Sequence, residues 1–253
     1  MRTAGLKARM MAGEVLSGTF VKIPDVTVIE VLAQSGLDFL CLDTEHAGFG
    51  RDRLDACLAV ARALDMPVLV RVSAGTPEAI LQALDAGAVG VVVPHVYSVD
   101  KAEEVARAAH FGAGGRGYAG STRWAGFATR PMAEVLAQDV ETIVIAQIEE
   151  PEGVEAAQAI AAVPGIDALF AGPADLSVAY GHDNTGSDDL QRALARIGEA
   201  ARAEGRAYAT WVSSPAQAAD WARHGVSVFV VASEHSWMRE GAAAAARGIK
   251  ALG

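Results

Sequence analysis

The sequence predicts a parallel (β/α)8 barrel, an α/β fold that forms one domain over residues 1–253. Two observations favour it: about eight short apolar runs are each followed by a segment with helical spacing, and several runs end in polar side chains. Parallel strands need a crossover helix between them, and barrel active sites lie at the C-terminal ends of the strands. A doubly wound open sheet is the main alternative. No glycine-rich dinucleotide fingerprint follows the first apolar run, which weakens that alternative.

Each strand is predicted from a short apolar or β-branched run. The eight runs are residues 16–21, 38–42, 67–72, 89–93, 142–148, 167–170, 206–212 and 226–231. Each helix is predicted from apolar residues spaced three and four positions apart, as at Leu54, Leu58 and Ala61. The predicted helices span residues 24–36, 51–64, 77–86, 99–109, 132–138, 151–162, 188–204, 215–224 and 236–252.

One long segment breaks this alternation. Residues 112–118 are rich in glycine, and irregular sequence continues through Arg123-Trp124 to Arg130-Pro131. An insert of this length is more often a functional loop than a plain connection. We therefore expect residues 112–131 to serve the function.

The composition excludes several classes of protein. The formal net charge is −10, which disfavours attraction to nucleic acid or anionic lipid, so we expect neither as a partner. No apolar run is long enough to span a bilayer, and no apolar core follows the basic N-terminal residues as it would in a secretory signal. Cys41 and Cys57 fit neither a disulfide framework nor a thiolate metal site, so we expect buried side chains in a reducing cytoplasm.

The run that begins at Phe39 ends in Asp43, Glu45 and His46. His46 is the candidate proton-transfer group, because an imidazole changes charge near neutral pH and an adjoining carboxylate can set its tautomer or raise its basicity. The alternative is a structural or surface histidine. Arg71 ends another run and is a candidate to bind a carboxylate or a developing oxyanion, or else to form an ion pair inside the barrel.

Two further strand ends carry oxygen ligands. In Gln147-Ile148-Glu149, alternation sends Gln147 and Glu149 to the same side, and Asp175 follows the next strand. Two carboxylates at one rim suit Mg²⁺ or Mn²⁺; the alternative is that each caps a helix. The turn Gly172-Pro173-Ala174-Asp175 offers backbone N–H groups to a carboxylate, particularly if a helix begins there.

The remaining histidines and two tryptophans are weaker candidates. His95 ends a strand and is expected to face the pocket. Trp124 and Trp211 either line a substrate pocket or belong to the core. The other histidines lie in helical or loop contexts and are predicted to be solvated: His110, His182, His224 and His235.

Four segments in this order and spacing resemble the HpcH/HpaI family of class II pyruvate aldolases, from about Gly18 to the C-terminus. They are Leu42-Asp43-Thr44-Glu45-His46, Val70-Arg71, Gln147-Ile148-Glu149 and Phe170-Ala171-Gly172-Pro173-Ala174-Asp175-Leu176-Ser177. The resemblance implies a metal-dependent barrel, like 4-hydroxy-2-oxoheptane-1,7-dioate aldolase. Such an enzyme reversibly cleaves a 4-hydroxy-2-oxo acid to pyruvate and an aldehyde through a metal-stabilised enolate. It also implies a homo-oligomer, typically a hexamer built as a trimer of dimers, with terminal helices exchanged between subunits.

The resemblance further implies a role for each site residue. Glu149 and Asp175 would bind the divalent ion, which is Mg²⁺ or Mn²⁺ in the first place, with Co²⁺ or Zn²⁺ also compatible. Acid-base chemistry would fall to His46, supported by Asp85. The remaining assignments are Arg71 and Gln147 at the substrate, Gly172, Pro173, Ala174 and Asp175 around its carboxylate, and Asp43 and Glu45 as supports.

Two other functions stay open at this stage. One is a lyase acting on acyl-CoA thioesters, as in the related citryl-CoA and malyl-CoA lyases, although nothing in the sequence marks a CoA site. The other is a noncatalytic barrel that binds a 2-oxo acid. A lysine Schiff base is disfavoured, because only Lys22 among Lys7, Lys22, Lys101 and Lys250 stands near a strand end.

Overall fold

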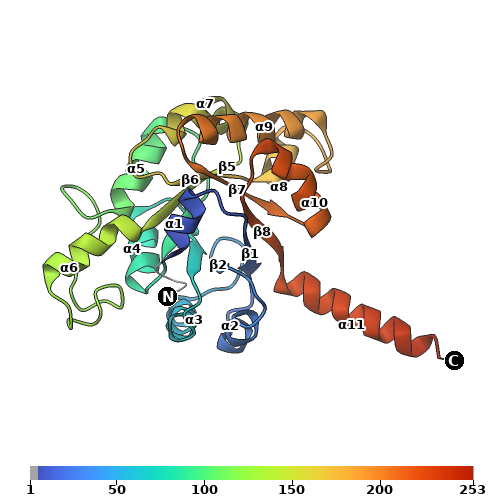
Figure 1. Cartoon of the computed structure of the whole chain (residues 1–253), viewed down its shortest axis with the longest axis horizontal. Coiled ribbons are helices and arrows are strands. Elements are labelled where there is room, and N and C mark those ends of the chain that lie inside the picture. The colour runs from blue at the N-terminus through green and yellow to red at the C-terminus, as the bar shows by residue number, and fades with distance from the viewer. Residues whose placement is uncertain (1–4, 253) are drawn as a thin grey trace.

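The computed structural model describes residues 5–252 and shows eight parallel strands closed into a barrel (Figure 1). The strands pair in sequence order, from β1 with β2 to β8 with β1, so the predicted barrel is confirmed and the open sheet is excluded. The strands are β1 (Leu16–Val21), β2 (Phe39–Asp43), β3 (Val68–Arg71), β4 (Gly90–Val93), β5 (Ile143–Ile148), β6 (Ala168–Ala171), β7 (Ala207–Val212) and β8 (Val228–Ser233). The predicted domain also includes residues 1–4 and 253, which lie outside the described part.

Helices alternate with the strands, and α1 and α8 are additions to the predicted set. The helices are α1 (Leu6–Met11), α2 (Val26–Leu32), α3 (Arg51–Ala63), α4 (Pro77–Asp85), α5 (Val99–Ala109), α6 (Met132–Ala137), α7 (Pro151–Ala161), α8 (Pro173–Ala179), α9 (Asp188–Ala203), α10 (Pro215–Trp221) and α11 (Glu234–Lys250). Short 3-10 turns follow α6 and α10, at Gln138–Glu141 and Ala222–His224.

Local sequence explains where several helices begin. The Thr76 hydroxyl accepts the backbone N–H of Ala79 at the start of α4, and Ser98 and Ser187 cap α5 and α9 in the same way. Proline occupies the first turn of α4, α7, α8 and α10, where its missing N–H costs no helical hydrogen bond. Because the first residue of each of these helices is fixed, the short connection from the preceding strand is fixed as well.

The core has two layers. One lies between the strands and the surrounding helices, and the other fills the barrel with side chains such as Phe20, Phe39 and Phe170. Helix α1 closes the N-terminal end of the barrel, because Leu6 and Met10 pack into the inner layer. That end of the barrel interior is plugged by apolar side chains, which leaves the C-terminal ends of the strands as the place for a site.

A bulge in β8 shapes the other end of the barrel. Gly18 pairs with Val230 but Phe20 pairs with Ser233, and Ala232 between them has a φ of 51°. The extra residue bends the strand end, as β-bulges do. Directly after it, the buried carboxylate of Glu234 accepts the backbone N–H groups of Lys22 and Ile23 at 2.6 and 2.5 Å, which ties the start of α11 to the end of β1.

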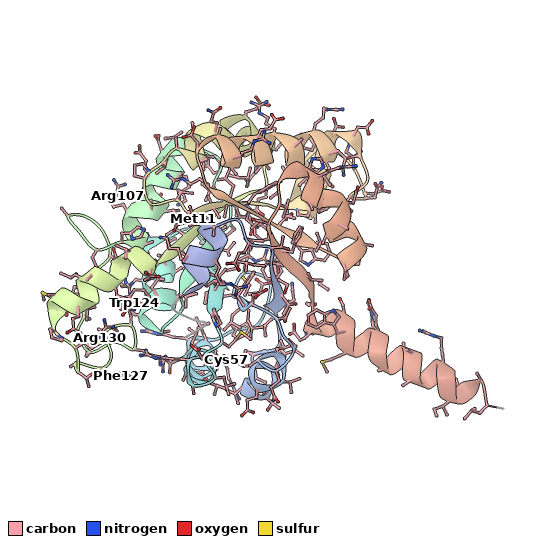
Figure 2. All side chains as sticks on the ribbon, in the orientation of Figure 1. Met11, Cys57, Arg107, Trp124, Phe127 and Arg130 are labelled. Atoms are coloured by element: carbon pink, nitrogen blue, oxygen red, sulfur yellow. The ribbon has the colours of Figure 1, made fainter. Side chains whose placement is uncertain are left out.

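Helix α11 then extends away from the barrel (Figure 1). Glu234 is its one buried residue, and Met238 and Ile249 are exposed. Figure 2 shows the side chains of this helix standing clear of the body of the molecule. A helix held only at its first turn lacks the packing that normally stabilises helices. None of the described helices, α11 included, combines the length and apolar character that crossing a bilayer requires.

Candidate active site

A cavity of about 510 Å³ opens where the C-terminal ends of the strands meet. Its walls include the predicted residues His46, Arg71 and Gln147, together with the turn from Gly172 to Asp175. A larger groove of about 900 Å³ runs along the outside between α3 and α4, and the only predicted site residue that it contains is Asp85. The chemistry therefore lies in the smaller cavity.

Asp43 organises one wall of the cavity from a fully buried position. Its two oxygens accept Arg71 Nε at 3.0 Å and Nη2 at 2.7 Å, and Lys22 Nζ lies 3.1 Å away. Burial acts to raise the pKa of Asp43, but the bonds to Arg71 and Lys22 outweigh it and lower the pKa to about 2. Asp43 is thus a permanent anion between two cations.

The same carboxylate shapes the turn that carries His46. Asp43 Oδ1 accepts the backbone N–H groups of Glu45 at 3.2 Å and His46 at 3.1 Å. The imidazole of His46 remains more than half exposed, with Nε2 3.7 Å from Glu45 Oε2. It therefore borders the cavity with a nitrogen available to a bound molecule, and Asp43 supports it through the backbone.

Gln147 and Glu149 end β5 side by side. Gln147 Nε2 donates to Glu149 Oε2, and the backbone N–H of His95 donates to Glu149 Oε1 at 2.7 Å. Burial raises the pKa of Glu149 despite these donors, because a desolvated carboxylate resists ionisation. A cation beside it would offset that cost.

The carboxylates of Glu149 and Asp175 face one another across Gly172. The position of an added Cβ at Gly172 is 3.1 Å from Glu149 Oε2 and 3.6 Å from Asp175 Oδ2, and no room remains for that carbon. Asp175 lies in the first turn of α8 and is exposed to the cavity. The site fits a divalent ion: two hard oxygen donors converge, and the buried Oε1 of Gln147 lacks a hydrogen-bond partner.

His95 follows β4 and turns toward the carboxylates of Glu149, Glu150 and Glu45. Its φ of 57° is unusual for a residue with a side chain. Nδ1 lies 2.5 Å from Glu150 Oε1 and 3.2 Å from Glu149 Oε1, and Nε2 lies 3.6 Å from Glu45 Oε1. Partial burial acts to lower its pKa, but these three carboxylates raise it overall.

The structure does not bring Asp85 to His46 within one chain. Helix α4 runs from the C-terminal end of β3 to the N-terminal end of β4, so its last residue, Asp85, lies at the far end of the barrel. There its carboxylate pairs with Arg116 at 2.5 Å, and that guanidinium is buried between the rings of Phe111 and Trp124. A role for Asp85 beside His46 therefore stays a prediction without support from the single chain.

The insert lies at that same far end, because it follows a helix and precedes β5. Arg123 pairs with Asp55 of α3 at 2.6 Å and donates to the Ala86 carbonyl at 2.5 Å. Figure 2 shows Trp124, Phe127 and Arg130 together on one flank of the molecule. The insert contributes no wall to the cavity of its own chain, so the expected functional role is not seen there.

Several residues that line the cavity are not predicted from the sequence to do so. Lys22, expected only to stand near a strand end, lines the cavity. His235 is exposed, in agreement with its predicted solvation, and it also lines the cavity. Trp211 lines it as one of its two expected roles, whereas Trp124 is buried in a small cluster with Ala125 and Val135. The missed residues Ser233, His235 and Ser236 follow the β8 bulge, which apolar periodicity does not reveal.

A closed parallel barrel with acidic, basic and imidazole groups at its C-terminal end is the architecture of barrel enzymes. The model of the family "HpcH/HpaI aldolase/citrate lyase" matches residues 16–238, so the chain belongs to the HpcH/HpaI aldolase/citrate lyase family. The resemblance noted in the sequence is thereby confirmed.

Named relatives cover nearly the whole chain. A hydroxypyruvate/pyruvate aldolase of Paraburkholderia phytofirmans is 32% identical over 93% of this chain and 94% of its own. A 5-keto-4-deoxy-D-glucarate aldolase of an Enterobacter species is 31% identical over 90% of both. Among solved structures, an HpcH/HpaI aldolase/citrate lyase family protein from Burkholderia cenocepacia has a TM-score of 0.93 at 32% identity, covering 98% of this chain and 100% of its own. A citrate synthase, SbnG, has a TM-score of 0.87 at 30% identity over 98% of both chains.

Proposed function

We propose that the protein is a class II pyruvate aldolase, which reversibly cleaves a 4-hydroxy-2-oxo acid to pyruvate and an aldehyde. The observation that carries the proposal is that His46, Arg71, Gln147 and Asp175 line one cavity, while the buried carboxylate of Glu149 lies directly behind its wall, bonded to Gln147 and close to Gly172. The relatives named as aldolases support the same reaction class.

Glu149 and Asp175 are the residues proposed to hold a divalent ion, Mg²⁺ or Mn²⁺. When bound, such an ion supplies a Lewis acid beside the oxygen on which negative charge develops. The first-turn N–H groups of Ala174 and Asp175 have no acceptor within their own helix and are proposed to bind the substrate carboxylate. Gln147, buried beneath them, orients Glu149 through the hydrogen bond from its amide.

His46 is proposed to move the proton. In the synthesis direction its free imidazole nitrogen removes a proton from the pyruvate methyl group, the carbon adds to the aldehyde carbonyl, and the imidazolium returns the proton to the new alkoxide oxygen. In cleavage the imidazole takes the proton of the 4-hydroxyl group as the C3–C4 bond breaks, and it then gives that proton to the released carbon. Arg71, held by Asp43 and stacked 4.2 Å from the Phe20 ring centroid, presents fixed positive charge to the substrate oxygens.

The test follows deuterium exchange into the methyl group of pyruvate by NMR. We expect exchange with Mn²⁺ or Mg²⁺, none after chelation, and a loss of at least about 100-fold in His46→Ala, since general bases contribute on that order. His182→Ala is the control, because His182 pairs with Asp189 outside the cavity. Folded protein that binds the metal but shows no metal-dependent exchange would overturn the proposal and, if thioesters are not turned over either, leave a noncatalytic 2-oxo-acid-binding barrel.

A second candidate function has one observation in its favour, the likeness of the chain to the citrate synthase SbnG. It is a lyase or synthase that acts on an acyl-CoA thioester rather than on a simple 2-oxo acid. Incubation with acetyl-CoA or malyl-CoA separates the two, because thioester turnover without pyruvate exchange would replace the aldolase by this alternative.

We further propose that the protein is a homo-oligomer, a hexamer in the family arrangement, in which α11 packs against another subunit. What supports this is the exposure of α11 beyond its first turn in a single chain. A partner subunit would supply the packing that a lone helix lacks.

A further inference from the structure

We propose that Glu45, His95 and Glu149 form a second cation position, beside the one proposed between Glu149 and Asp175. The imidazole nitrogen makes this position selective for Zn²⁺, Co²⁺ or Ni²⁺ over Mg²⁺. The position shares Glu149 with the proposed ion site and rests on the proposed function to that extent. One ligand atom from each of the three residues lies within 4.8 Å of the others.

The first step concerns which nitrogen of His95 carries its proton. Nδ1 lies 2.5 Å from Glu150 Oε1, so Nδ1–H donates to that carboxylate. The lone pair then resides on Nε2, which points toward Glu45 Oε1 at 3.6 Å. A carboxylate that fixes the tautomer of an imidazole in this way is the usual outer partner of a metal-ligating histidine.

The second step concerns what lies between His95 and Glu45. Two ligand atoms that share a Zn²⁺ ion at about 2.0–2.1 Å lie roughly 3.0–3.4 Å apart. The observed 3.6 Å between Nε2 and Glu45 Oε1 is close to that spacing.

The third step concerns the two carboxylates. The Glu45 side chain is nine-tenths buried, and its Oε2 has no hydrogen-bond partner, although Arg71 Nε lies 3.3 Å away. Glu149 is almost completely buried, with Oε1 toward His95 and Oε2 toward Gln147 and Gly172. Its oxygens therefore face two different cation positions, as a bridging carboxylate does in two-metal sites.

The chemical type of the ligand atoms determines which metal ion each position prefers. Carboxylate oxygens alone suit Mg²⁺ or Mn²⁺, whereas an imidazole suits Zn²⁺, Co²⁺ and Ni²⁺. The position at Glu149 and Asp175 is all oxygen, and the position at His95 is mixed. The two positions consequently have different preferences, which allows them to be measured separately.

The experiment titrates metal-free protein with Zn²⁺ and with Mg²⁺ by calorimetry, for the wild type, His95→Asn and Asp175→Asn. Asparagine suits position 95, because it tolerates a positive φ better than most residues; His95→Gly is the second variant, and circular dichroism checks the fold. We expect His95→Asn to weaken Zn²⁺ binding at one position by at least about 10-fold to 100-fold. Mg²⁺ binding should stay within about threefold of the wild type.

A second readout is the visible absorption of bound Co²⁺, which responds to nitrogen ligation. We expect the spectrum to change in His95→Asn and to stay unchanged in the control His182→Asn. Unaltered Zn²⁺ affinity and an unaltered Co²⁺ spectrum in folded His95→Asn and His95→Gly would overturn the inference, as would absence of Zn²⁺ binding by the wild type. Loss of Zn²⁺ binding in His95→Asn, with Mg²⁺ binding intact in Asp175→Asn, would support the inference and overturn the proposed Glu149–Asp175 ion site instead.

Discussion

Asp43 connects the buried barrel to the cavity, because one carboxylate holds Arg71, Lys22 and the turn before His46. Its pKa of about 2 in the folded protein lies below the ordinary 3.8. A carboxyl group with a depressed folded-state pKa adds stability above its unfolded pKa, and that stability is lost as the pH falls toward the folded pKa. For Asp43 the loss falls between about pH 4 and pH 2.

Because the pKa of Asp43 is lowered on folding, the stabilisation that Asp43 contributes should depend on pH. Asp43→Asn removes the anion at every pH, so the difference in unfolding free energy between the wild type and the variant should shrink in acid. We expect it to shrink by about 2 kcal/mol between about pH 5 and pH 2. Urea unfolding across this range measures it, and a difference that stays constant with pH would contradict the assignment.

A substitution at Arg71 that keeps the positive charge tests the geometry of its two hydrogen bonds to Asp43. Its Nε and Nη2 each bond one oxygen of Asp43, and a lysine ammonium cannot reproduce that fork. We expect Arg71→Lys to lower the free energy of unfolding by about 1–3 kcal/mol. The control is Arg192→Lys, an exposed pair with Asp189, where about 0–1 kcal/mol is expected. Equal effects in the two variants, measured by urea unfolding, would show that the fork contributes little.

Polar residues at the C-terminal end of a predicted strand are expected at the active-site end of a barrel. This expectation correctly placed His46, Arg71, Gln147 and Glu149 at the end of the barrel where the cavity opens. It could not locate Lys22 or His235. The cavity role of His235 depends on the bulge at Ala232, and that backbone irregularity has no apolar pattern. The predicted helix over residues 77–86 already implies that Asp85 lies at the opposite end of the barrel, as observed, and only the family resemblance set it beside His46.

At the scale of elements, the fold was predictable where the pattern was long and periodic. Every predicted strand overlaps an observed one, since parallel strands are buried on both faces and appear as apolar runs. Helix α1 was missed because six residues carry too few apolar positions for a period to show. Helix α8 was obscured because Gly172-Pro173 is typical of a turn, although proline also suits the first turn of a helix.

One close helix contact gives a prediction at this scale. A Cβ on Gly198 in α9 would lie 2.0 Å from the carbonyl oxygen of His224, which is backbone and cannot move aside easily. Alanine normally stabilises a helix by about 1 kcal/mol relative to glycine, but here we expect Gly198→Ala to destabilise by about 1–3 kcal/mol.

The matched control is Gly241→Ala in α11, where nothing lies within 4 Å of the added carbon. That substitution should leave the melting temperature unchanged or raise it. Thermal unfolding of both variants decides the matter, and an unchanged melting temperature in Gly198→Ala would show that α9 shifts freely.

At the scale of the molecule, α11 is the element that the barrel does not need for its own closure. We expect a chain that ends at residue 240 to lose the higher assembly, because most of the exposed helix is gone while Glu234 and its bonds to β1 remain. A chain that ends at residue 250 is the control and should assemble like the wild type. Light scattering coupled to size-exclusion chromatography reports the mass, and an unchanged assembly in the shorter chain would place the interface elsewhere.

Glu234 has a consequence for how the protein behaves on dilution. The residue that starts the projecting helix also holds the backbone of Lys22, and its neighbours Ser233 and His235 form part of the cavity wall. A displacement of α11 would therefore reach the wall of the cavity within a few residues. If the proposed aldolase is the proposed oligomer, we expect its turnover per protomer to fall when dilution separates the subunits, with no change in substrate or metal.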